Sequence, residues 1–277
     1  MAIEMGRGLQ SSSVVNGVQL AALQYVQEKS KKLSEKSRSL LLKRFESFGF
    51  EETELKQTLR YIRNEAPIIV HLNLDKALDF LVNDTHYRNQ FETRTSGGML
   101  SESTRIQWED RLFGRIYHHS DGLERVKYGV LNIVNDPNGV LCCRGYGDSY
   151  LLLKNSDVRL RTTFASADTS DPSVKLASCE HYAHVLNEYN DVELKEVIAV
   201  ATKRVFHSSS ANISVYKEVQ IHGPLRLHDD LEALVVNSRH KRQPKIKKLV
   251  DQFASQFGCN VIWMEPDAPV HGALGVF

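Results

Sequence analysis

The sequence has no strong excess of charge of either sign and no long apolar run. Its 277 residues contain 35 Lys and Arg against 34 Asp and Glu, which gives a formal net charge of +1. A protein that holds nucleic acid through a general basic surface carries a clear positive excess, so we expect no nucleic-acid partner. Apolar runs such as residues 66–70 are far shorter than the ~20 residues that span a bilayer, so we also expect no membrane partner.

Glycine, proline and cysteine are too few for several architectures. With 16 Gly and 7 Pro the chain is neither collagen-like nor of low complexity. The four cysteines are too few for a disulfide scaffold: Cys142 and Cys143 are adjacent, Cys179 and Cys259 are isolated, and no C-x-x-C pair occurs. We therefore expect buried free thiols in a reducing compartment. Residues 1–5 contain an acidic residue and no basic one, and no long apolar stretch follows, so we expect no Sec-type signal peptide.

The spacing of apolar residues predicts an α+β fold with a mostly antiparallel sheet. Helical spacing over residues 17–45 and 54–63 predicts an N-terminal helical extension that ends before Pro67. Residues 68–73 are apolar and β-branched, as in an inner strand, and Asn73 is placed to cap a helix that reaches residue 81. We divide the chain into a flexible N-terminus (1–16), the helical extension (17–66) and a sheet domain (67–277).

The remaining pattern fills this sheet domain. We expect a loop at 91–103, a helix at 106–116, and a hairpin formed by 126–135 and 140–144 around the turn at 136–139. Strands are expected at 149–154, 158–165 and 213–222, and helices at 174–190, 191–203 and 239–257, followed by an apolar segment at 260–264.

The expected strand 213–222 carries polar side chains that could do chemistry. Because side chains alternate between the two faces of a strand, Tyr216, Glu218, Gln220 and His222 should share one face beside the turn that starts at Gly223. This face either lines a cleft or is an ordinary solvated outer face.

A second candidate is the loop around residues 87–98. Thr93, Thr95 and Ser96 offer hydroxyls, two glycines follow, and Phe91 offers a stacking surface, as in a ligand loop. The alternative is a surface turn whose hydroxyls bond to local backbone groups. The loop fits neither the mononucleotide P-loop nor the Rossmann fingerprint.

Four strings in this order resemble a known family of enzymes. They are Phe91-Glu-Thr-Arg-Thr-Ser-Gly-Gly98, Tyr128-Gly-Val-Leu-Asn132, Arg161-Thr-Thr-Phe164 and Glu218-Val-Gln-Ile-His-Gly-Pro224. Together they are similar to mono-ADP-ribosyltransferases, and more closely to the CteC-like family of bacterial type III effectors that ADP-ribosylate ubiquitin on threonine. The resemblance spans roughly residues 60–236. It implies that residues 67–277 form a mono-ADP-ribosyltransferase-like catalytic domain.

The resemblance implies an activity and roles for individual residues. The chain would use NAD⁺ as substrate and no metal, modify ubiquitin on a threonine hydroxyl, block host ubiquitination, and act in the host cytosol as a secreted effector. Glu218 would be the catalytic glutamate, Thr95 and Ser96 would support the cleft, and Phe91 would stack on nicotinamide. The segment that contains Ser209 and Asn212 is placed like the loop that recognises the acceptor protein. Its alternative is a flexible connection.

Two departures from the family pattern bear on the acceptor and on NAD⁺ binding. Arginine-modifying transferases carry Glu or Gln two residues before the catalytic glutamate, whereas this chain has Tyr216, which favours a hydroxyl acceptor. The basic residue expected near the first strand is either Arg63, a fixed cation suited to pyrophosphate, or His71 within the strand.

Three further interpretations follow from the sequence. An NAD⁺ glycohydrolase and a catalytically inactive binding module are the alternatives to the transferase. His118, His119 and Asp121 lack a partner at helical spacing, so no zinc site is expected there. The basic run 240–248 is interpreted as a solvated face, and contact with an acidic partner or nucleic acid is its alternative.

Overall fold

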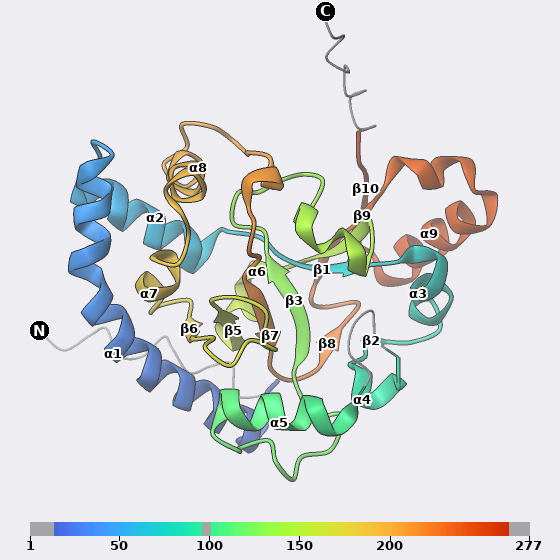
Figure 1. Ribbon diagram of the computed structural model, residues 1–277. Helices are drawn as coiled ribbons and strands as arrows, with labels where there is room; N and C mark the ends of the chain where they lie inside the picture. The colour runs from blue at the N-terminus through green and yellow to red at the C-terminus, as the bar shows by residue number, and fades with distance from the viewer. Residues whose placement is uncertain (1–13, 96–100, 266–277) are drawn as a thin grey trace, which may run out of the picture.

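An eight-stranded sheet runs through the computed structural model, which describes residues 14–95 and 101–265 (Figure 1). The strand order is β10-β9-β4-β1-β3-β7-β5-β6, and neighbours are antiparallel except for β10 and β9. The strands are β1 (Ile68–Leu72), β3 (Lys127–Leu131), β4 (Ser149–Leu153), β5 (Thr162–Ala165), β6 (Leu176–Ser178), β7 (Glu218–Ile221), β9 (Leu231–Val236) and β10 (Asn260–Trp263). A separate two-stranded sheet joins β2 (His86–Tyr87) and β8 (Leu225–Arg226). The predicted α+β fold with a mostly antiparallel sheet is confirmed.

Helices cover the ends and faces of this sheet. They are α1 (Gly17–Ser47), α2 (Glu52–Asn64), α3 (Leu74–Leu81), α4 (Gln90–Thr93), α5 (Glu102–Phe113), α6 (Asn155–Val158), α7 (Ala183–Leu186), α8 (Asp191–Ala201) and α9 (Pro244–Phe257). The short 3₁₀ helices are η1 (Leu141–Tyr146), η2 (Arg159–Arg161), η3 (Ser210–Asn212) and η4 (Ser238–Arg242). Figure 1 shows α1, α2, α7 and α8 gathered towards one end of the sheet and α3 and α9 at the other.

Local sequence explains where several helices begin and end. Asn16 and Gln19 form a capping box at the start of α1, which satisfies backbone N–H groups that have no partner within the helix. Pro244 opens α9, where its missing N–H has no cost. Gly114 ends α5 with φ 61°, a left-handed conformation that glycine adopts without strain.

The main hydrophobic core lies on one face of the sheet. Alternate strand residues such as Ile68, Val70 and Val219 pack there against α1, α2, α3, α7, α8 and α9. Leu41 and Phe45 of α1 belong to the same core, so the predicted helical extension packs directly on the sheet domain. Of the segment predicted to be flexible, residues 1–13 lie outside the described residues.

The opposite face of the sheet carries a smaller apolar cluster and several polar side chains. Ile69, Val130 and Tyr150 form its apolar part, and η1 adds Cys143. Gln220 pairs across the sheet with Tyr128 of β3 and with Thr163 of β5, so polar residues of three neighbouring strands share this face.

Several predicted elements differ in type or length, three of them at residues 140–144, 174–190 and 213–222. Residues 140–144 lie at the start of η1 rather than in a hairpin strand, although the turn before them is real: Gly139 has φ 76° and its N–H donates to Asp136 O at 3.0 Å. Residues 174–190 form β6 and the short helix α7 instead of one helix, because β6 pairs with β5 at the sheet edge. The strand predicted at 213–222 begins only at Glu218.

The shortening of that last strand has a local cause. The backbone N–H and the hydroxyl of Ser214 both donate to Glu193 Oε1 of α8 at 2.8 Å, which holds this residue outside the sheet. Val215 is 45% exposed although it is apolar, whereas Lys217 is 2% exposed. The alternation therefore holds for residues 218–221 and fails before them.

The expected buried thiols also need one correction. Cys143 and Cys179 are buried and Cys259 is half-buried, but Cys142 is exposed on η1. A 3₁₀ helix at the surface turns one of two adjacent side chains outwards.

Candidate active site

Glu218 opens β7 near the centre of the sheet, on the face opposite the main core. Its cross-strand partner is Val130 of β3, which itself lies opposite Ile69 of β1. Partners in an antiparallel pair share a face, so the Glu218 side chain points away from the helices that cover the main core. The residue is 8% exposed. A carboxylate on a central strand, with apolar neighbours on the same face, is held in one place.

Two hydrogen-bond donors hold one oxygen of this carboxylate. The Thr169 hydroxyl donates to Glu218 Oε1 at 2.7 Å, and the Gln220 amide donates to the same oxygen at 3.1 Å. Within residues 14–95 and 101–265, Glu218 Oε2 accepts no hydrogen bond. One oxygen is thus fixed by the protein and the other is free for a ligand.

The environment places the titration of this group near neutrality. Burial raises the pKa of Glu218 to about 7, and the negative charge of Asp168 acts in the same direction. The hydrogen bonds from Thr169 and Gln220 and the positive charge of Arg105 act against this rise. A carboxyl group that titrates near pH 7 can accept and release a proton under physiological conditions, and such shifts are concentrated at functional sites.

Phenol and carboxylate groups surround Glu218. The Tyr216 hydroxyl donates to the Asp168 carboxylate and lies 3.3 Å from the Tyr146 hydroxyl. Burial and these two hydrogen bonds raise the pKa of Tyr216, so its phenol stays protonated at neutral pH. The site therefore presents the protonated phenol of Tyr216 next to the ionised Asp168 and the titrating Glu218.

Arg105 of α5 brings a cation to this site. Its guanidinium carbon lies 4.9 Å from the centre of the Tyr128 ring and 5.1 Å from that of Trp108, so aromatic rings support it. The Arg105 guanidinium makes no hydrogen bond or ion pair with the described part of the chain, and its Nε is buried without a partner. Its charge remains available for an anionic ligand near Glu218.

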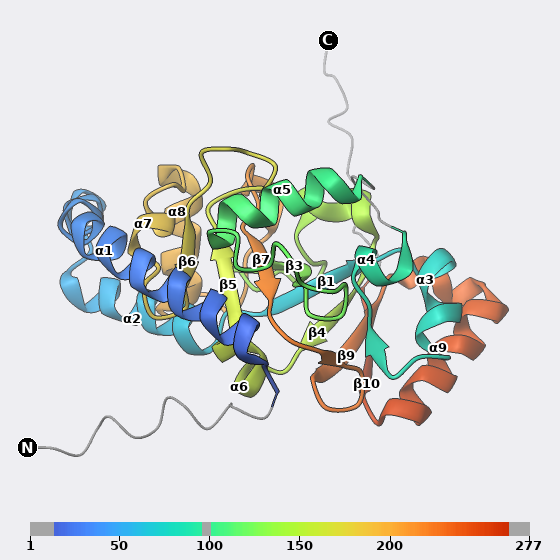
Figure 2. The same ribbon diagram turned by 90° about the horizontal axis from the view of Figure 1, so that it is seen from below.

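A buried ion pair fixes α5 in position. Glu109 accepts a hydrogen bond from Arg125 Nη1 at 2.6 Å and from the Tyr128 hydroxyl at 3.1 Å. Glu109 is 0% exposed and Arg125 is 3% exposed, so water reaches neither charge and each compensates the other. Figure 2 shows α5 running past β5, β7 and β3. The pair thus ties the helix that carries Arg105 to the strands next to Glu218.

His71 lies on the same face of the sheet as Glu218, two residues after Ile69 on β1. Its Nδ1 lies 2.8 Å from Gly147 O, and its Nε2 accepts the Val140 N–H at 3.1 Å. Burial lowers the pKa of His71, so the ring is neutral and Nδ1 is the donor. Both ring nitrogens are engaged with the backbone around η1.

Arg63 lies elsewhere. It belongs to α2, whose buried residues contribute to the main core on the opposite face of the sheet. Its guanidinium pairs with Glu180 at 3.2 Å, just beyond β6. Among the described contacts, none joins Arg63 to Glu218, so the structure does not bring these two predicted site residues together.

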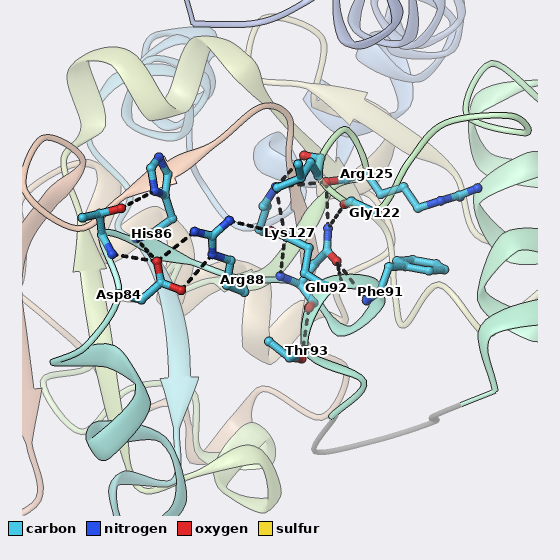
Figure 3. A network of polar contacts seen from close by, with 12 residues as sticks. Asp84, His86, Arg88, Phe91, Glu92, Thr93, Gly122, Arg125 and Lys127 are labelled. Carbon is cyan, nitrogen blue, oxygen red and sulfur yellow. Dashed lines mark hydrogen bonds and ion pairs between the residues drawn. The ribbon is translucent and has the colours of Figure 1, made fainter.

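The predicted ligand loop is anchored by a polar network (Figure 3). Asn89 caps α4 and donates to Gly122 O at 2.6 Å, while Arg88 bridges Asp84 and Glu92. The buried Lys127 lies 3.6 Å from Glu92 and joins this network to β3. The network holds α4 against β3.

The candidate side chains of this loop make local contacts. Figure 3 shows Phe91 beside Arg125, whose guanidinium carbon lies 4.6 Å from the centre of the ring. The Thr95 hydroxyl donates to Thr93 Oγ1 at 3.0 Å, and both residues are exposed. The Thr93 hydroxyl also donates to Asn89 O at 3.1 Å and accepts the Thr95 N–H at 3.2 Å, and these are bonds to local backbone groups of the kind that the surface-turn alternative requires. Ser96 lies outside the described residues.

The predicted acceptor-binding residues are spread along the segment before β7. Ser209 caps η3, Asn212 donates to Glu196 of α8 at 2.5 Å, and both are exposed. Tyr216 is in contact with Asp168 at the Glu218 site. On the same segment Phe206 is 86% exposed beside a pocket of about 340 Å³ that Tyr61, Asn135 and Val205 also line.

Residues 14–95 and 101–265 were found to hold neither a cluster of metal ligands nor a membrane-spanning helix. No group of three His, Cys, Asp or Glu side chains in these ranges is arranged to hold a metal ion. None of the helices described here is long and apolar enough to cross a membrane. A second pocket, of about 320 Å³, lies near the start of α1 and is lined by Arg88 and Lys127 but not by Glu218.

Sequence reasoning missed several residues that the fold brings to Glu218. Arg105, Asp168 and Thr169 come from α5 and from the loop after β5, far from residue 218 in sequence. The resemblance marked the string around Thr163, but the residues in the loop after β5 carried no signal, because their role depends on long-range contacts.

The chain matches one protein family. The match covers residues 70–190 and 180–267, and the family is described as "Protein of unknown function (DUF3626)". Because the match spans more than half of the chain, the protein belongs to this family. No curated protein matches the chain.

Proposed function

We propose that this protein is a mono-ADP-ribosyltransferase that transfers ADP-ribose from NAD⁺ to ubiquitin on a threonine hydroxyl. The observation that carries the proposal is Glu218: a buried carboxylate on a central strand with one oxygen fixed, one oxygen free and a pKa near neutrality. The resemblance of the strings around Tyr128, Thr163 and Glu218 to ubiquitin-modifying effectors supplies the substrate and the acceptor. On this proposal the protein is a secreted effector that blocks ubiquitination in the host cytosol.

The reaction needs a carboxylate that stabilises positive charge and a base that accepts a proton, and Glu218 can serve as both. As the bond between nicotinamide and ribose breaks, positive charge develops on the ribose, and an ionised carboxylate stabilises it where it appears. The threonine oxygen then forms a bond to the ribose carbon, and its proton passes to a base. A carboxylate with a pKa of about 7 can serve as that base once nicotinamide has left.

We further propose that Arg105 binds the pyrophosphate of NAD⁺. Its guanidinium is the cation whose charge acts on Glu218, and it forms no ion pair within the described part of the chain. Arginine presents donors in a planar fork that suits phosphate oxygens. His71, the alternative cation on this face, is neutral and fully engaged.

Replacing Arg105 tests this assignment. We expect Arg105→Ala to raise the Kd for NAD⁺ about tenfold or more, because a hydrogen-bonded charge pair is lost. Arg63→Ala is the matched control, since Arg63 is one of the two basic residues that the sequence offered for this role and it lies on the other side of the sheet. Isothermal titration with NAD⁺ measures both. A larger rise in the Kd for NAD⁺ with Arg63→Ala than with Arg105→Ala would show that Arg63 binds the pyrophosphate.

The acceptor chemistry gives a further expected result. Tyr216 offers neither the second carboxylate nor the amide that positions a guanidinium two residues before the catalytic glutamate. We expect the product linkage to survive neutral hydroxylamine, which cleaves ADP-ribosyl-arginine and acid-ester linkages, and fragmentation to place it on a threonine. Linkage to an arginine would contradict the hydroxyl acceptor and leave the role of Glu218 unchanged.

Nicotinamide release distinguishes the transferase from its alternatives. A transferase releases nicotinamide rapidly only when ubiquitin is present. Equal release without ubiquitin would indicate an NAD⁺ glycohydrolase, in which water takes the place of the acceptor. No release under either condition would leave a catalytically inactive binding module.

A further inference from the structure

A chain of buried hydrogen bonds leads from Tyr117 to Glu218. The Tyr117 hydroxyl lies 2.7 Å from His222 Nδ1, and His222 Nε2 lies 3.2 Å from Thr163 Oγ1. The Thr163 hydroxyl lies 2.9 Å from Gln220 Oε1, and Gln220 Nε2 lies 3.1 Å from Glu218 Oε1. The four residues behind Glu218 are each at most 1% exposed. We call these four residues the relay.

The chemistry of the groups gives the relay one direction. The Gln220 amide nitrogen faces the carboxylate, because the amide oxygen would repel an ionised Glu218. The amide oxygen therefore accepts a hydrogen bond from the Thr163 hydroxyl. Because the only hydroxyl proton of Thr163 is in that bond, the Thr163 oxygen is the acceptor of its hydrogen bond with His222 Nε2.

The far end of the relay agrees with this direction. Burial lowers the pKa of His222 to about 3, so the ring is neutral and carries one proton, which Nε2 needs for its bond to Thr163. His222 Nδ1 must then accept from Tyr117. Burial raises the pKa of Tyr117 well above its ordinary value, so this phenol keeps its proton to donate. In each hydrogen bond of the relay, the donor is therefore the residue further from Glu218.

We propose that the relay positions Glu218 and leaves its Oε2 as the oxygen that reacts. The proposal rests on the proposed transferase function. Donors from Gln220 and Thr169 both meet Oε1, so rotation of the carboxylate would break two hydrogen bonds. Oε2 is then directed at the ribose and takes the proton of the acceptor hydroxyl. Relay residues touch no substrate and act only through Glu218.

Other titratable and charged groups face Glu218 and must be held constant in a test. They are Asp168 from the loop after β5, Arg105 from α5, Tyr128 from β3, Cys143 from η1 and Tyr216 before β7. None of them belongs to the relay, so substitutions in the relay leave all of them in place.

Four variants isolate the relay. Gln220→Met keeps the shape of the side chain and removes the donor to Glu218. Thr163→Val removes the hydroxyl one step further away, and Thr163→Ser restores it. Thr162→Val is the matched control, because Thr162 is equally buried and its hydroxyl donates to Val158 O on the other side of β5.

Two measurements are made on each variant. Carbon-13 NMR follows the titration of the Glu218 carboxyl carbon, assigned by its absence in Glu218→Gln. Steady-state kinetics of nicotinamide release with ubiquitin give kcat and KM for NAD⁺. The first measurement does not depend on the protein being an enzyme.

We expect Gln220→Met to raise the pKa of Glu218 by about one unit, since the lost donor favours the ionised form. At pH 7 kcat should fall about tenfold while KM for NAD⁺ changes little, as for a loss confined to the transition state. Thr163→Val should shift both quantities in the same direction and by less. Thr163→Ser and Thr162→Val should behave as the wild type.

An unchanged Glu218 titration in Gln220→Met would overturn the relay, and so would equal effects of Thr162→Val and Thr163→Val. If the titration shifts as expected but the wild-type protein releases no nicotinamide, the orientation of Glu218 stands and the proposed transferase function falls.

Discussion

Glu218→Gln is expected to abolish ADP-ribosyl transfer while leaving the protein folded and able to bind NAD⁺. The amide cannot stabilise the positive charge on the ribose or take a proton, and the loss of such a transition-state interaction lowers kcat by about 10²-fold or more. Nicotinamide release in the presence of ubiquitin measures kcat, and titration calorimetry measures NAD⁺ binding. Turnover close to wild type would remove Glu218 from the mechanism.

The same substitution has an expected effect on stability. The folded pKa of Glu218, about 7, lies above its ordinary value of 4.5, so the folded state binds more protons between these values. Its contribution to stability is therefore present at low pH and is lost as the pH rises towards 7. We expect Glu218→Gln to unfold at an equal or higher temperature than wild type at pH 8. A clear loss of stability at this pH would mean that the ionised carboxylate is structural.

Glu109→Ala is expected to have the largest effect on stability. It leaves Arg125 buried at 3% exposure without its carboxylate and removes the partner of the Tyr128 hydroxyl. Breaking a buried pair by removing one member costs about 3–5 kcal/mol. Urea denaturation followed by circular dichroism measures the free energy of unfolding.

Glu188→Ala is the control for this prediction. Glu188 pairs with Lys175 at 2.7 Å, but both side chains are more than 40% exposed. Exposed pairs contribute about 0–1 kcal/mol, so this variant should resemble wild type. Similar losses in the two variants would show that the Glu109 pair does not hold α5 against the sheet.

Much of the fold could be predicted because its signals are local. Apolar spacing located α1, α2 and the inner strand β1, and the turn at Asp136 was visible from its composition. Residues 174–190 were wrongly predicted as a helix, because composition favours a helix there and only the pairing of β6 with β5 decides otherwise. The early end of β7 depends on Ser214 binding Glu193, a contact that no local pattern shows.

The residues of the candidate site also separate into those with a local signal in the sequence and those that only long-range contacts identify. Glu218 and Gln220 lie on one face of β7, as alternation within a strand predicts. Arg105, Asp168 and Thr169 reach Glu218 from elements that are distant in sequence, so only the fold could identify them. The choice between Arg63 and His71 could not be settled from sequence either, because it depends on which face of the sheet each residue occupies.

The measurement that tests the central claim most directly is the intact mass of ubiquitin after incubation with this protein and NAD⁺. The proposed function predicts one added ADP-ribose unit with the wild-type protein and none with Glu218→Gln. Ubiquitin of unchanged mass after incubation with folded, NAD⁺-binding wild-type protein would contradict transfer to ubiquitin.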